Sequence, residues 1–158
     1  KIWAEVVGFA MTSDASDIVL PNPDGAARAM SGALADAWIG ADAVDHINAH
    51  GTGTTANDRS ETTALTAVFG DRLGEIPVTA TKSLHGHLIG AAGAVELLAC
   101  LLALNEGIIP ATAGYLGPDP ECAVDLVTGQ ARQADVQVVL SNAFAFGGLN
   151  AVLALRRA

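Results

Sequence analysis

The stretch KSLHGHLIGAAG at positions 82–93 links a short strand to the most apolar helix of the chain, which we predict over 87–104. Lys82 and His87 therefore lie just before a helix N-terminus, where backbone N–H groups are free and the helix dipole has its positive end. That setting favours a neutral imidazole at His87, which can form a hydrogen bond to a developing enolate. The alternative interpretations are a solvated surface lysine and a helix-capping histidine, and His85 is a weaker candidate for chemistry.

Outward from this stretch, strand and helix patterns alternate along the chain, which predicts a layered α/β architecture in one domain, residues 1–158. A glycine-containing turn is predicted over 144–150. Helices are expected over 23–38, from a cap at Asn57 or Asp58 to Phe69, and over 87–104; strands are expected over 2–11, 44–49, 78–81, 136–140 and 151–155.

The composition narrows the class of protein. Hydrophobic residues make up 51% of the chain and charged residues 16%, which is typical of a well-buried globular domain and excludes a disordered one. The low charge also indicates that another chain or domain covers part of the surface. The net charge is −9 and the Lys and Arg residues are scattered, so we expect no nucleic-acid binding.

Neither Cys100 nor Cys122 belongs to a metal-binding spacing, so we expect no metal site and a reduced, cytoplasmic protein. The run 88–104 approaches the length of a membrane span, but Glu96 interrupts it, so we expect a buried core helix and no membrane contact. The chain opens at Lys1 directly into strand-like sequence, which favours a piece of a larger protein.

Three further segments place polar residues at the ends of apolar elements, where active sites collect in α/β folds. His50 follows a predicted buried strand and precedes a glycine-containing turn, although a structural histidine is an equally simple interpretation. Asp58 and Glu61 share a helix face and can do acid–base work, cap the helix or hold a cation. The loop 144–150 can present backbone N–H groups to an oxyanion or move as a gate, or it is a tight turn with core aromatics.

Together the four segments resemble the C-terminal half of the β-ketoacyl-acyl-carrier-protein synthases, of the elongating fatty-acid type and its polyketide relatives. The matching pieces are HGTGT at 50–54, ND-x-x-E at 57–61, KS-x-x-GH-x-x-GAAG at 82–93 and F-x-FGG-x-N at 144–150. The resemblance implies a thiolase-like fold, in which two similar halves, each a sheet layered with helices, pack into one body.

The resemblance also implies a mechanism. A cysteine of the first half takes the acyl chain as a thioester, malonyl carrier protein loses carbon dioxide, and the enolate attacks the thioester. His50 and His87 would stabilise the enolate as neutral Nε donors. Lys82 looks like the active-site lysine of the family and Glu96 like its acidic partner, which would also explain a lone charge in an apolar helix.

Further roles follow from the same resemblance. Asp58 and Glu61 match positions that organise the site, and the backbone N–H of Phe144 matches one oxyanion-hole donor, with the Phe144 ring gating the acyl pocket. The gating loop comprises Phe146, Gly147 and Gly148. Two features depart from the family pattern: the chain has no nucleophilic cysteine segment, and Ala145 stands where the family usually has glycine.

The resemblance therefore implies partners rather than a cofactor of the chain itself. These are an N-terminal half that carries the nucleophilic cysteine, and acyl carrier protein, which delivers acyl and malonyl groups on its phosphopantetheine arm. Whole ketosynthases of this kind form homo- or heterodimers. The alternative function is a non-catalytic partner subunit, similar to the chain-length factors of polyketide systems; the retained histidines and lysine favour the enzyme.

Overall fold

The computed structural model describes all of residues 1–158, and its centre is a mixed six-stranded sheet in the order β1-β8-β7-β2-β3-β5. Strand β8 runs antiparallel to both β1 and β7, whereas β2 pairs in parallel with both β7 and β3, and β3 pairs in parallel with β5. The strands are β1 (Glu5–Ser13), β2 (His46–Asn48), β3 (Pro77–Thr79), β5 (Asp125–Leu126), β7 (Val138–Ala145) and β8 (Leu149–Arg156); β4 (Ile108–Ile109) and β6 (Arg132–Gln133) form a separate two-stranded sheet.

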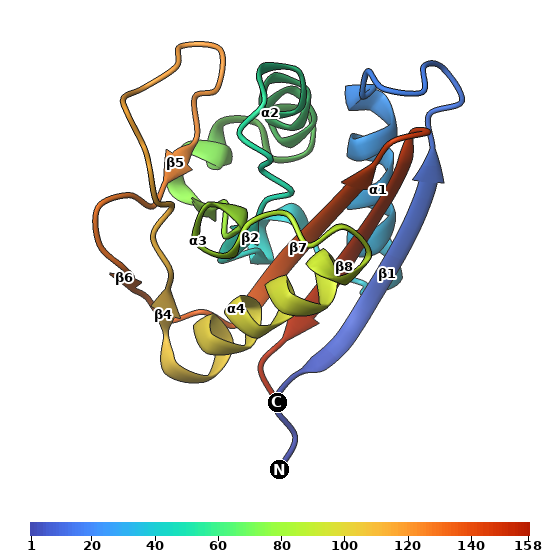
Figure 1. The fold of residues 1–158 in the computed structure, drawn as a ribbon. Helices are drawn as coiled ribbons and strands as arrows, with labels where there is room; N and C mark the ends of the chain where they lie inside the picture. Colours follow the sequence, from blue (N-terminus) through green and yellow to red (C-terminus); the bar gives the residue numbers. More distant parts are fainter.

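Helices cover both faces of the sheet, as the alternating pattern predicts. In Figure 1, α4 crosses in front of β7 and β8, and α1 lies behind them. The α-helices are α1 (Pro23–Asp36), α2 (Thr55–Phe69), α3 (Lys82–His85) and α4 (Ala92–Glu106), and the short 3-10 helices are η1 (Ala41–Ala43), η2 (Gly70–Glu75) and η3 (Ile89–Ala91).

The alternation of side chains along β7 divides the core into two clusters. Leu140 belongs to a cluster of 19 buried residues that packs α1 and α2 against one face of the sheet. Its neighbour Val139 points to the other face and joins a cluster of eight, which includes Cys100 and Leu104 of α4. Because successive residues of a strand face opposite sides, one strand supplies both cores.

Helix α4 corrects the expectation of a buried core helix. One face, which includes Glu96 and Cys100, is buried, but Leu98 and Leu102 on the other face are exposed. The window Ile89–Glu106 is long and apolar enough to cross a membrane, with 28% of it buried in this chain. The second apolar surface of α4 is therefore open, and it adjoins the sheet face on which β1 exposes Phe9 and Met11, away from α1.

Several predicted boundaries shift. The helix expected from residue 87 begins at Ala92, because Gly86 and Ile89 have φ of 79° and 53°, outside the helical region. The turn expected over 144–150 contracts to three residues, since β7 continues to Ala145 and β8 begins at Leu149. Helix α3 and the two-residue strands β4, β5 and β6 were not predicted.

Candidate active site

Two histidines and a phenylalanine from three separate segments meet at the end of β2. The ring of His50 lies 5.6 Å from that of His87, measured between centroids and with the planes nearly perpendicular at 82°. Phe144, from β7, lies 5.6 Å from His50 on another side. The structure therefore brings together the two histidines that the sequence singled out, from positions 37 residues apart (87 − 50).

His50 is buried and its backbone is held on both sides. Its N–H donates to Glu61 Oε1 at 2.8 Å, and its carbonyl accepts from Lys82 Nζ at 2.6 Å. Burial, together with smaller contributions from the nearby Lys82 and His87, lowers the pKa of His50 to about 3. The imidazole is therefore neutral near pH 7, as a hydrogen-bonding group for an enolate must be.

The ring of His87 is oriented by a local hydrogen bond. Its Nδ1 accepts a hydrogen bond from the backbone N–H of Ile89 at 3.1 Å, so the proton of a neutral ring is on Nε2. His87 is exposed in this chain and lies five residues before α4 begins, so it does not stand at the helix N-terminus that the sequence predicts. The contact with Ile89 N–H fixes the orientation of its ring.

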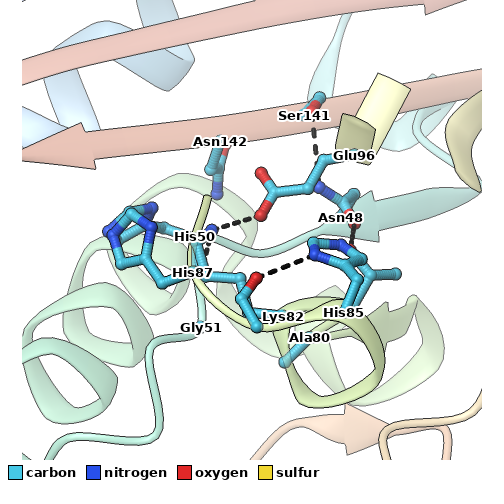
Figure 2. A network of polar contacts seen from close by, with 12 residues as sticks. Asn48, His50, Gly51, Ala80, Lys82, His85, His87, Glu96, Ser141 and Asn142 are labelled. Carbon is cyan, nitrogen blue, oxygen red and sulfur yellow. Dashed lines mark hydrogen bonds and ion pairs between the residues drawn. The ribbon is translucent and has the colours of Figure 1, made fainter. Parts of the chain in front are cut away.

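Lys82 and Glu96 form a buried ion pair. Lys82 Nζ contacts Glu96 Oε1 (Figure 2), and both side chains are almost wholly excluded from solvent. A solvated surface lysine is thus excluded. Because Lys82 also donates to the His50 carbonyl, one ammonium group ties α4 to the end of β2.

Glu61 accepts four hydrogen bonds and contacts no cation. Its carboxylate receives the N–H groups of His50 and Gly51 and the side-chain amides of Asn57 and Asn142. Burial raises the pKa of Glu61, and the four donors oppose that shift. Asp58 lies at the helix surface with one bond from Asn57 Nδ2, so the two predicted carboxylates have different environments.

The residues of the predicted gating segment separate into two environments. Phe144 is a buried member of β7, packed in the larger core, which is unlike a mobile turn. Phe146 is 78% exposed at the turn, and its backbone N–H makes no hydrogen bond within the chain. Positive φ occurs at Gly147 and Gly148 and not at Ala145, so the alanine at this position is accommodated without strain in this conformation.

Neither cysteine is placed for catalysis. Cys100 is fully buried, and burial raises the pKa of its thiol to about 12, which keeps it in the inert thiol form. Burial raises the pKa of Cys122 as well, and the groups that act on it are Thr62, Asp119, Asp58 and Arg59, none of which is a histidine. The expectation that this chain lacks the nucleophile agrees with both positions.

Sequence reasoning missed the amides that complete the site. Asn142 is fully buried and bonds Glu61, and Asn48 links Thr81 of the segment before α3 to Ser141 of β7. Asn48 is the last residue of strand β2, two residues before His50, whereas Asn142 lies within β7, two residues before Phe144. A polar side chain at the carboxyl end of a parallel strand is a signal that could have identified Asn48.

Comparison with known proteins gives the family. The sequence profile of the β-ketoacyl synthase C-terminal domain matches residues 3–116. Nodulation protein E of Rhizobium sp. is 49% identical over 156 residues, which cover 99% of this chain and 39% of that protein. A 3-oxoacyl-(acyl-carrier-protein) synthase 2 of Synechocystis sp. is 46% identical over 159 residues, covering 99% of this chain and 38% of that protein.

The fold agrees with the sequence comparison. A solved structure of the ishigamide ketosynthase/chain length factor superposes with a TM-score of 0.96 and 44% identity, covering 100% of this chain and 39% of that one. This chain thus spans about 39% of the length of these relatives. The paired histidines, the buried lysine and the mixed sheet agree with these comparisons. The chain therefore belongs to the β-ketoacyl synthase family and is a C-terminal domain of it.

Proposed function

We propose that this chain is the C-terminal half of a condensing enzyme that decarboxylates malonyl carrier protein and joins the resulting enolate to a cysteine-bound acyl group. The observation that carries the proposal is the pair of imidazoles, His50 and His87, whose ring centroids lie 5.6 Å apart beside Phe144. Two N–H donors from adjacent imidazoles can stabilise the oxygen of an enolate. The N-terminal half supplies the nucleophilic cysteine.

In the proposed reaction, the bond between the malonyl carboxylate and its methylene carbon breaks, and carbon dioxide leaves. The electron pair remains on the thioester enolate, whose oxygen accepts hydrogen bonds from His50 and His87. The enolate carbon then attacks the acyl thioester, and the cysteine thiolate leaves. Acyl and malonyl groups arrive on the phosphopantetheine of acyl carrier protein, so the chain needs no cofactor of its own, and the enzyme works in the cytoplasm as a dimer of whole ketosynthases.

The other groups support this step. Lys82 and Glu96 fix the carbonyl side of His50, while Glu61 fixes its N–H side. The oxyanion of the attacked thioester takes a backbone N–H from the β7–β8 turn. The sequence predicts Phe144 as that donor, but Phe144 lies in strand β7; the unpartnered N–H of Phe146 is the donor that the turn offers, and the exposed ring of Phe146 suits a gate better than the buried ring of Phe144.

The test uses this chain combined with an N-terminal half from a related synthase. His50→Ala and His87→Ala should each lower malonyl decarboxylation by 10²-fold or more, the usual effect of removing an oxyanion donor. Acylation of the cysteine by acyl carrier protein serves as the internal control, because it needs only the nucleophile and its own surroundings. Full decarboxylation in both variants would refute the proposal.

A non-catalytic role, as in a chain-length factor, is the alternative, because a ketosynthase/chain length factor structure superposes closely on this chain. It predicts that neither histidine substitution changes turnover and that only the length of the product changes. Lys82 and both histidines are present and assembled, which favours catalysis.

A further inference from the structure

The segment between α3 and α4 is held at one point. From Ser83 to Ala91 every residue is exposed except His85, which is partly buried. This segment carries His87, so the position of the proposed donor depends on how the segment is anchored. Sequence reasoning gave His85 no function, and nothing in the proposed reaction uses it.

His85 makes one hydrogen bond, and it goes to the peptide that precedes His87. Its Nδ1 lies 2.8 Å from the carbonyl oxygen of Gly86; a carbonyl only accepts, so Nδ1 carries the proton and donates. The other ring nitrogen, Nε2, is buried and has no partner. The ring is therefore confined by its surroundings, and its single polar contact is the Gly86 carbonyl.

Gly86 is thus bonded on both sides. Its N–H donates to the carbonyl of Lys82 at 2.8 Å, and its own carbonyl accepts from His85. A Cβ added at Gly86 would meet nothing within 4 Å, so that side of the residue is open. The two hydrogen bonds hold the φ of 79° and ψ of 175° at Gly86, which set the direction in which the chain continues to His87.

We propose that His85 is a positioning residue for His87: by donating Nδ1–H to the Gly86 carbonyl it fixes the turn that orients the His87 ring towards the enolate oxygen. This inference rests on the proposed function, because it gives His87 a catalytic task. The hydrogen bond of Ile89 N–H to His87 Nδ1 then sets the ring's tautomer, so one contact orients the backbone before His87 and the other orients the ring itself.

Three substitutions test this in the reconstituted two-half synthase. His85→Leu removes the donor and keeps an apolar side chain of similar width. His85→Asn restores an N–H at the position of Nδ1, and His85→Gln is the matched control because it places its amide one bond further out. We expect decarboxylation to fall about tenfold in the Leu variant, to return to within about threefold of the parent in the Asn variant, and to stay low in the Gln variant.

Two readouts separate positioning from simple loss of structure. Acylation of the nucleophilic cysteine and the thermal midpoint should be unchanged in the Leu variant, since the bond orients an exposed segment. In a His87→Ala background, His85→Leu should cause no further loss, because a positioning residue acts only through the residue it positions.

The outcomes distinguish this inference from the proposed function. If His87→Ala impairs decarboxylation but His85→Leu does not, or if the Asn variant is as impaired as the Leu variant, the positioning role is refuted and the proposed function stands. An additional loss in the His87→Ala background would also refute it, because His85 would then act independently. If His87→Ala has no effect, both fail.

Discussion

Lys82 and Glu96 are the clearest case in which one residue determines the environment of another. Each charge is acceptable in the interior only because the other is present, and the desolvation cost of a buried pair offsets much of its attraction. The second carboxylate oxygen of Glu96 has no partner within the chain, so the pair depends on its single contact with Lys82.

Removing one member should therefore cost more than removing both. Lys82→Met or Glu96→Leu alone should destabilise the fold by about 3–5 kcal/mol, because each leaves an unpaired buried charge. The double variant should recover most of the free energy of unfolding but none of the decarboxylation activity. Urea denaturation of the reconstituted synthase measures the first and carbon dioxide release the second; a double variant as unstable as the sum of the singles would contradict this account.

Glu61 is predicted to act on the backbone of His50. Glu61→Gln replaces one accepting oxygen with an NH₂ group that faces existing donors, so at least one N–H near His50 loses its acceptor. We expect a fall in decarboxylation of about 10- to 100-fold with the pKa of His50 still low. Asp58→Asn is the matched control: its carboxylate lies at the helix surface with one bond, so its effect should stay within about twofold.

At the scale of single residues, the sequence identified most of the side chains that meet at the candidate site. His50, His87, Lys82 and Glu96 were identified from motif and from the oddity of a charge in an apolar run, and the structure brings them together. Phe144 was placed in a turn and lies in a strand, because the turn signal of Gly147 and Gly148 does not show where the ladder of hydrogen bonds stops. Hydrogen-bond partners such as Asn142 were missed because they depend on contacts across 81 residues of chain.

Among the elements, helix α4 depends for its stability on the glycine at its C-terminus. Gly107 closes the helix in the left-handed conformation with φ of 67°, and an added Cβ would lie 2.6 Å from the carbonyl oxygen of Ala134. Gly107→Ala should therefore cost the backbone penalty of about 1 kcal/mol and a further steric cost. Gly129→Ala is the matched control, with φ of 74° and open space around it. Equal thermal shifts in the two variants would show that the contact with Ala134 relaxes freely.

A buried histidine in strand β2 makes the stability of the fold depend on pH. His46 is fully buried, its Nδ1 bonds the Pro77 carbonyl, and burial lowers the pKa of its imidazole from 6.5 to about 4. As the pH falls below 6.5 the unfolded chain binds a proton that the folded chain excludes until about pH 4, so stability decreases across that window. By this linkage His46 should account for about 2 kcal/mol of the loss between pH 7 and pH 5.

His46→Asn isolates this effect, since it keeps a donor for Pro77 but does not titrate. Its stability should fall less between pH 7 and pH 5 than that of the parent in urea denaturation. His50 contributes a loss of the same sign, because its pKa is lowered too, so both proteins should lose some stability. Identical pH dependence in the two would show that His46 is not excluded from protonation.

The type of an element could be predicted where its hydrophobic pattern extends over many residues. Helices α1 and α2 and strands β7 and β8 follow from their periodicity, whereas β5 and β6 contain two residues each and carry no pattern to detect. The predicted start of α4 was wrong because hydropathy carries no information about φ. The apolar run includes Ile89, but the backbone there is not helical.

For the whole molecule, the open apolar surface of α4 and β1 is the feature with most consequence. Leu98 and Leu102 on the helix and Phe9 and Met11 on the strand are exposed, and this chain spans about 39% of its relatives. Apolar surface of this kind is usually covered by another part of the same assembly. We expect the N-terminal half of the synthase to cover it.

Phe9→Lys with Leu98→Glu should make the isolated chain more soluble and should prevent it from restoring activity to an N-terminal half. Trp38→Lys is the control, because Trp38 is 94% exposed at the end of α1, on the other side of the sheet. Dye binding to exposed apolar surface and size-exclusion chromatography of the mixture report the two effects. Normal assembly of the doubly charged variant would show that the partner binds elsewhere.

The pairing of β1 with β8 has a practical consequence for protein engineering. Glu5 lies opposite Arg156 in that ladder, so the two chain ends leave the domain side by side, as Figure 1 shows. A short linker could join them, and a new start could be opened in the exposed loop between Tyr115 and Glu121, which lies outside every strand and helix. Such a circularly permuted gene would have the β7–β8 hairpin synthesised before the first strand, and the domain it encodes should still fold.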